Sequence, residues 1–241
     1  MPLARTRLLP VARAGLRFNG VNQYVRVADT LGIPASSSFT FEVLAFLRQA
    51  VTGQNQYFIA KHYRAAIRGH YMGIPNLGMI WLYSDGTMSE WNSGRNIVNL
   101  WSHLAMVYDS SAQKMYLYLN GTEISGGRPI AKPLSEGLDY YVGAWTYGYG
   151  FIPATISVAR IYSRALSSEE ILWNYYYPDN PVRNGLVLWL HYDTIDTANN
   201  KWYDKSGFGN HATLYNGPVK EDVVLPPKRS LSPTRTLSPV R

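Results

Sequence analysis

Short runs in which apolar and polar residues alternate dominate this chain, and turns rich in Gly, Asn, Ser and Pro separate them. Alternation with a period of two places every second side chain on the same face of a strand. Strands that recur at such short spacing favour an antiparallel sandwich or barrel. We therefore expect an all-β fold, with strands in the segments Gln23–Ala28, Phe39–Arg48, Tyr57–Tyr63, Met79–Ser84, His103–Asp109, Lys114–Gly121, Tyr140–Trp145, Ala154–Ser163 and Leu186–Tyr192.

One short helix is expected in the segment SRALSSEEILWNYYYP. Ser167 or Ser168 suits the N-cap, because a serine hydroxyl accepts a hydrogen bond from a free N–H of the first turn. Glu169 and Glu170 follow in that turn, where negative charge is favourable. Pro178 then ends the helix.

The chain has 241 residues, a net charge of +7 and no cysteine. This length suits a single β-domain, and the lack of cysteine excludes disulfides and Cys-based zinc sites. Eight of the 23 basic residues lie in the first 17 and the last 14 residues, where there is no acid, so the middle is close to neutral. We expect a basic arm over residues 1–15, a sandwich over 16–226, and a Pro/Ser/Arg arm over 227–241. The arm residues expected to serve in assembly, or to contact a polyanion such as nucleic acid, are Arg5, Arg7, Arg13, Lys228, Arg229, Arg235 and Arg241.

Five segments occur in an order that resembles the laminin-G-like, concanavalin A-like family: LRFNGVNQYVRV, FTFEVLAFLR, WSHLAMVYDSSAQKMYLYLNGTEI, YYVGAW and ATISVARIYSRALSSEEI. The resemblance covers about residues 16–177. It implies a two-sheet antiparallel jelly-roll sandwich, a fold used by lectin and adhesion modules and by virus particle proteins. With the features above, we expect this sandwich to carry one short helix and extended terminal arms.

The stretch WYDKSGFGNHATLYNGP also resembles this family, but there it comes first, whereas here it follows the other segments. The chain therefore looks circularly permuted, with residues 185–218 supplying the family's first strands. The stretch either folds back beside its own N-terminal strand or fills that place in a neighbouring copy. We favour the first arrangement, because an exchange between copies requires extra ordering of the linker.

Catalytic and metal sites find little support in the sequence. Glycanases of this fold use two or more carboxylates on one strand, but the strand FTFEVLAF offers only Glu42. The five histidines fall in no motif. The resemblance suggests a calcium site near the strand ATISVARIY, but Ser157 and Val158 occupy the positions where relatives carry acids. We therefore expect no cofactor and no metal.

Two aromatic loops are the candidate ligand-binding surface. WTYGYGF contributes Trp145, Tyr147 and Tyr149, and SEWNSGRN contributes Trp91, Asn92 and Arg95. Exposed rings can stack on a sugar, a base or a partner protein. The alternative interpretation is that these rings cover an end of the sandwich or a subunit contact.

The lack of long apolar runs and the placing of the charges indicate the class of protein. The sequence has no apolar run that suits a signal peptide or a membrane span, and its body is nearly neutral between two basic arms. The leading prediction is a non-enzymatic structural protein of a virion (capsid, decoration or fibre) or of an extracellular surface lattice, tied to copies of itself or to other structural proteins by its arms. The alternative is a carbohydrate-binding lectin or adhesion module, and a glycan-cleaving enzyme ranks last.

Overall fold

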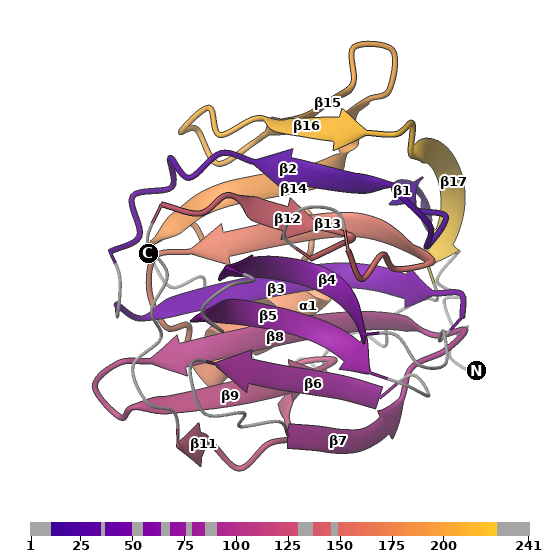
Figure 1. Ribbon diagram of the computed structural model, residues 1–241. Helices are drawn as coiled ribbons and strands as arrows, with labels where there is room; N and C mark the ends of the chain where they lie inside the picture. The colour runs from indigo at the N-terminus through magenta and orange to yellow at the C-terminus, as the bar shows by residue number, and fades with distance from the viewer. Residues whose placement is uncertain are drawn as a thin grey trace, which may run out of the picture.

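The alternating runs form antiparallel strands that build two sheets packed face to face (Figure 1). The computed structural model describes residues 11–34, 37–49, 55–63, 68–75, 79–84, 91–129, 137–145 and 149–225. The front sheet, which faces the viewer in Figure 1, has the strand order β15 (Lys201–Asp204), β16 (Ala212–Tyr215), β2 (Tyr24–Val27), β12 (Tyr140–Val142), β4 (Asn55–Tyr63), β5 (Arg68–Pro75), β6 (Met79–Ser84) and β7 (Trp91–Asn96).

The back sheet has the order β17 (Val219–Leu225), β1 (Val11–Arg17), β13 (Ala154–Tyr162), β3 (Phe39–Leu47), β8 (Trp101–Asp109) and β9 (Lys114–Leu119). Two short strands, β10 (Thr122–Glu123) and β11 (Arg128–Pro129), both pair with β9. The long strand β14 (Leu186–Asp196) pairs with β13 through its first half and with β15 through its second half. This strand therefore connects the two sheets.

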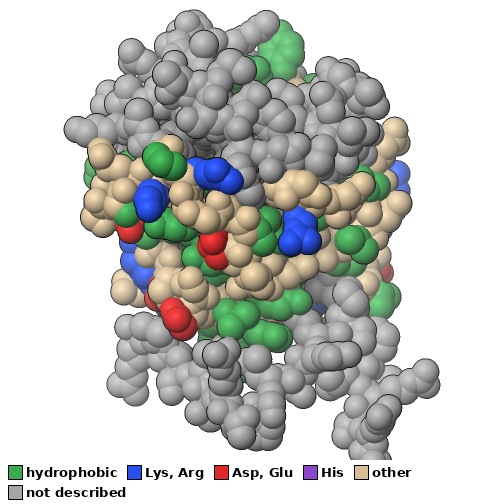
Figure 2. All heavy atoms as spheres, turned by 90° about the horizontal axis from the view of Figure 1, so that it is seen from below, with side chains coloured by type: hydrophobic (Ala, Val, Ile, Leu, Met, Phe, Trp, Pro, Cys, Tyr) green, Lys and Arg blue, Asp and Glu red, His purple; other side chains and the backbone are tan. Residues whose placement is uncertain are grey.

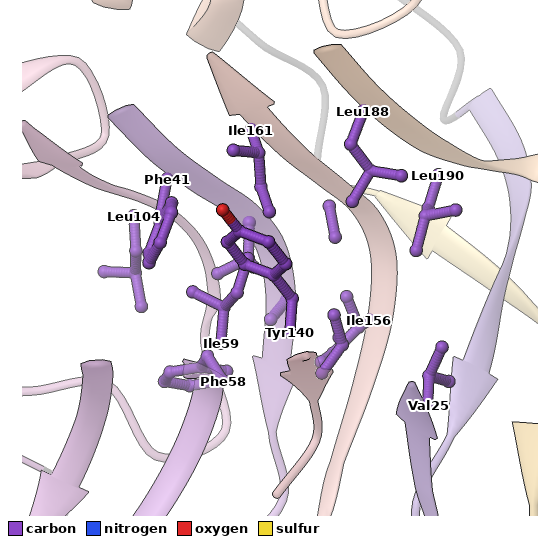
Figure 3. Close-up of a cluster of buried hydrophobic side chains, with 14 of the residues drawn as sticks. Val25, Phe41, Phe58, Ile59, Leu104, Tyr140, Ile156, Ile161, Leu188 and Leu190 are labelled. Atoms are coloured by element: carbon purple, nitrogen blue, oxygen red, sulfur yellow. The ribbon is translucent and has the colours of Figure 1, made fainter. Parts of the chain in front are cut away.

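The core lies between the inner faces of the sheets. Along β2, Val25 and Val27 are buried while Arg26 between them is exposed, as the alternation in the sequence predicts. Figure 3 shows the ring of Tyr140 in the middle of this core, among side chains from both sheets such as Phe41 and Ile59. Each buried side chain of this size contributes roughly 1.5–3 kcal/mol, so this layer is what holds the two sheets together.

The helix α1 (Ser168–Tyr176) covers the outer face of the back sheet. Ser167 is its N-cap and forms a capping box with Glu170, which confirms the predicted start. Ile171 is fully buried in a second apolar cluster that includes Leu44 of β3. At nine residues, α1 is far shorter than the roughly 20 apolar residues of a membrane-spanning helix, and no other helix in the described ranges could serve as a span.

The predicted fold class is confirmed: the chain forms an antiparallel two-sheet jelly roll with a short helix. The predicted strand Met79–Ser84 agrees with β6 at both ends, and the others agree with their strands within a few residues. Viewed from below, the described surface carries Lys, Arg, Asp and Glu side chains scattered among uncharged ones (Figure 2). This dispersed pattern fits the near-neutral balance of the middle of the sequence.

The boundary predicted for the N-terminal arm is wrong. β1 begins at Val11, inside the range 1–15, and is paired with β17 along its whole length. The side chain of Arg13 is only 11% exposed and forms an ion pair with Asp179 at 2.6 Å. Its charge is therefore compensated within the fold. The arginine-rich composition concealed a strand whose Ala14 and Leu16 face the interior.

The stretch 185–218 packs within its own chain. Thr213, Leu214 and Tyr215 of β16 pair with Arg26, Val25 and Tyr24 of β2. This is the folded-back arrangement that we favoured from the sequence. The circular permutation itself stays a prediction.

Candidate functional site

A pocket of about 470 Å³ opens on the outer face of the front sheet, over β16, β2 and β12. The lining residues come from these strands and from the turn before β12: Tyr24, Arg26, Gly137, Leu138, Asp139, Tyr141 and Tyr215. Three tyrosine rings and the charged side chains of Arg26 and Asp139 thus converge on one concave surface. A concavity with a few convergent polar groups is a common form of ligand site.

Strand register brings the pocket's side chains together. Tyr24 and Arg26 are two residues apart on β2, so both point outward. Tyr215 of β16 lies directly opposite Tyr24, and Tyr141 of β12 lies directly opposite Arg26. The rings of Tyr24 and Tyr215 are parallel, with centroids 4.7 Å apart, and the Tyr141 ring is 5.9 Å from that of Tyr24. Burial, and next the electrostatic effect of Tyr215, raise the pKa of Tyr24 above its usual value.

An ion pair between Arg26 and Asp139 lies at the edge of these rings. Asp139 Oδ2 accepts a hydrogen bond from Arg26 Nε, and Oδ1 accepts one from the backbone N–H of Asp29 at 3.0 Å. A hydrogen bond to Tyr215 and the contact with Asp139 raise the pKa of Arg26 further above its already high usual value. Like any arginine, Arg26 is a permanent cation. The pocket therefore offers ring faces, hydroxyls, a fixed cation and a fixed carboxylate, which together suit a ligand rich in hydroxyl groups.

The predicted aromatic loop lies beside this pocket on the same face. Trp145 is half-buried and packs on Tyr57 of β4, with ring centroids 5.7 Å apart. Tyr149 is 49% exposed, and the ring of Phe151 lies 6.3 Å from that of Tyr24. Tyr147 lies outside the described residues. The sequence thus identified a loop next to the pocket, although not the pocket itself.

The second predicted loop is placed elsewhere. Trp91 and Asn92 begin β7, where their backbones pair with β6, and their side chains lie outside the described part of the structure. Arg95 is exposed on the same strand. Three strands (β4, β5 and β6) separate β7 from β12. With strands about 4.8 Å apart, the two predicted groups do not form one site.

Of the predicted arm residues, Arg13 is the one that the structure describes. Arg13 belongs to β1, as described above. The others lie outside the described residues: Arg5, Arg7, Lys228, Arg229, Arg235 and Arg241.

Ser157, which stands where relatives carry acids, serves the fold, and so do the carboxylates of Asp204 and Asp109. The Ser157 hydroxyl is buried and donates to the backbone carbonyl of Ala14 at 2.8 Å. Asp204 accepts hydrogen bonds from its own turn, including the N–H of Asn210 at 3.0 Å. Asp109 does the same in the turn after β8, and hydrogen bonds there hold its pKa below its usual value. In the described part of the chain, no three His, Asp or Glu side chains converge where they could hold a metal ion.

Sequence reasoning missed all seven lining residues of the pocket, including the side chains of Tyr24, Arg26, Asp139, Tyr141 and Tyr215. A signal for two of them was present, because the predicted strand QYVRVA alternates and so places Tyr24 and Arg26 on one face. Nothing in the sequence indicates that Tyr215, nearly 200 positions away, lies opposite Tyr24. Only the pairing of β16 with β2 brings them together.

Several solved structures share this fold. A putative carbohydrate-binding protein from Bacteroides ovatus superposes with a TM-score of 0.68 at 18% identity, covering 90% of this chain and 61% of that one. A sialidase from Trypanosoma rangeli gives a TM-score of 0.55 at 16% identity over 68% of this chain and 28% of the sialidase. A heptameric SAP-like pentraxin from Limulus polyphemus gives 0.53 at 14% identity over 68% of this chain and 82% of the pentraxin. At sequence identities this low, the likeness to these structures shows a shared fold.

The chain thus spans less than two thirds of the Bacteroides protein and less than one third of the sialidase. A search of curated proteins gave no match. A family model does match residues 19–172, which is more than half of the chain. By this match and by its fold, the chain belongs to the concanavalin A-like lectin/glucanases superfamily.

Proposed function

We propose that this chain is a carbohydrate-binding protein that acts without catalysis, and that the pocket around Tyr24 and Arg26 is its glycan site. The observation that carries the proposal is the combination of tyrosine rings with a fixed Arg26–Asp139 pair in one cavity. The apolar faces of sugar rings pack on aromatic side chains. The hydroxyl groups between those faces need both donors and acceptors, and the ion pair supplies both.

The number of carboxylates that line the pocket argues against glycan cleavage. A glycosidase of the usual kind needs two carboxyl groups across the scissile bond. Among the described residues that line the pocket, Asp139 is the single carboxylate. Sugar binding without cleavage does not require a second carboxyl group.

Similar structures add support without deciding the question. The Bacteroides ovatus protein is named as a putative carbohydrate-binding protein. The Trypanosoma rangeli protein is a sialidase, an enzyme whose ligand is also a sugar. This fold is thus present in a protein named as a putative carbohydrate binder and over 28% of a sialidase, which supports the proposal.

A glycan array with two matched variants tests the proposal. Arg26→Gln removes the pocket's cation, and Arg95→Gln removes an exposed arginine of the predicted site on β7. We expect the wild-type chain and Arg95→Gln to bind the same glycans, and Arg26→Gln to lose at least tenfold in affinity. If no glycan binds the wild-type chain, the proposed function is wrong. If Arg95→Gln loses binding and Arg26→Gln keeps it, the site is on β7.

An assembly role in a virion or extracellular lattice is the second candidate. Val11 of β1 is paired with Leu225 of β17, so residues 1–10 and 226–241 join the described fold at one place. Basic segments joined there could tie the subunit to copies of itself, to other structural proteins or to a polyanion. The native mass of the full chain, compared with that of a chain lacking residues 228–241, tests this role. Two monomers would show that the assembly role is wrong.

A further inference from the structure

The charges in the pocket balance each other. Arg26 and Asp139 are the charged groups among its described lining residues, and they are in direct contact. The next carboxylate, Asp29, forms an ion pair at 2.6 Å with Lys61, whose side chain is only 3% exposed. Two cations and two anions therefore stand side by side, and none of the four charges is left for a ligand to neutralise.

Asp139 is held where it can act on a ligand. The backbone N–H of Asp29 fixes one oxygen and Arg26 binds the other, while the side chain is 22% exposed. The side chain of Arg26 is 46% exposed. An arginine has five N–H donors, so those that Asp139 and Tyr215 leave unused can reach hydroxyl oxygens of a bound sugar.

A carboxylated sugar meets an obstacle at this site. Its carboxylate would be attracted to Arg26 but would approach Asp139, which contacts the same guanidinium, and like charges this close repel. An uncharged sugar meets no such repulsion, and it loses less solvation when it enters the pocket.

We propose that Asp139 is a specificity-determining residue that makes this site select uncharged sugars over sugars that carry a carboxylate. This inference rests on the proposed function, since it names the ligand class of the same pocket. Negative selection by a fixed like charge is a general means of specificity.

Matched sugar pairs test the inference: glucose with glucuronate, galactose with galacturonate, and lactose with sialyllactose. Affinities are measured by calorimetry or by competition at pH 7 and low salt, using the sugars that the array identifies. The main variant is Asp139→Asn, which keeps the acceptor for the Asp29 N–H and leaves Arg26 uncompensated. The control is Asp222→Asn, which makes the same change in net charge at an exposed position on β17 of the back sheet.

The expected readout is the ratio of the two affinities within each pair. We expect the wild-type chain and Asp222→Asn to prefer the uncharged member at least tenfold, and Asp139→Asn to shift the ratio at least tenfold toward the carboxylated member. A purely structural role for Asp139 would weaken both members equally, and that result would overturn the inference.

Three further outcomes are decisive. If Asp139→Asn does not fold, the ratio of the two affinities measured for the wild-type chain decides. A preference for the carboxylated member of a pair overturns the inference. A tenfold preference for the uncharged member supports it. If the wild-type chain binds carboxylated sugars best at this pocket, the inference fails although the proposed function stands. If no glycan binds at all, both fail.

Discussion

Replacing Glu42 by Gln should cost this protein a large part of its stability. Glu42 lies on β3 under α1 and is 1% exposed. Its Oε2 atom is 3.1 Å from the guanidinium of Arg160. The Asn174 amide of α1 donates to both carboxylate oxygens at 3.0 and 3.1 Å, and His103 Nε2 lies 3.4 Å from Oε1. Glu42 thus joins the helix to three strands of the back sheet.

The magnitude follows from the burial of Arg160. Gln has nearly the shape of Glu, so the substitution leaves no cavity, but it removes the charge that compensates a guanidinium only 2% exposed. Breaking a buried pair by removing one partner costs about 3–5 kcal/mol. We expect a loss near the lower end, about 3 kcal/mol, because the amide oxygen can still accept a hydrogen bond.

Urea unfolding at pH 7, followed by tryptophan fluorescence, measures this loss. Asp222→Asn, on the exposed side of β17, serves as the control and should change the free energy of unfolding by less than about 0.5 kcal/mol. The double variant Glu42→Gln/Arg160→Met should lose less than the sum of the two single variants, since it leaves no unpaired charge. A loss below about 1 kcal/mol for Glu42→Gln would refute the reasoning.

The same residue predicts how stability depends on pH. Burial alone would raise the pKa of Glu42, but His103, Arg160 and the Asn174 amide outweigh burial and hold it below the usual value of 4.5. A carboxylate with a lowered pKa stabilises the folded state above its unfolded pKa, and this contribution is lost as the pH falls through the folded pKa. The difference in stability between the wild-type chain and Glu42→Gln should therefore be full above pH 4.5 and shrink in acid. A difference that is constant from pH 7 to pH 3 would contradict this assignment.

Three further substitutions test the fold and the site. Gly143→Ala should lower the free energy of unfolding by about 1–3 kcal/mol, because Gly143 has φ +84° and an added Cβ would lie 2.9 Å from the Phe18 ring; an unchanged melting temperature would contradict this. Ser167→Ala removes the acceptor for the Glu170 N–H and should cost about 1 kcal/mol in urea unfolding with an unchanged slope, whereas a Thr replacement should recover most of it. Tyr149→Ala, at a ring 49% exposed, should leave stability within about 0.5 kcal/mol but weaken glycan binding; equal affinities would remove the loop from the site.

The strands were the most predictable part of this molecule. Their alternation is local, so a stretch such as QYVRVA reveals both the strand and its outward residues. The N-terminal strand was missed because its arginines suggested a solvated arm. Its place in the sheet depends on β17, more than 200 positions away, and on Asp179, which compensates Arg13.

The sequence by itself determined the fold class, the start of the helix and the family, because periodicity, capping residues and the order of motifs are properties of neighbouring positions. The tertiary structure decided where the ligand pocket lies. Tyr215 and Tyr24 stack only because β16 returns beside β2, and Asp139 pairs with Arg26 only because β12 lies on the other side of that strand. Which distant strands become neighbours is decided by the packing of the whole core, and a local pattern of residues does not specify it.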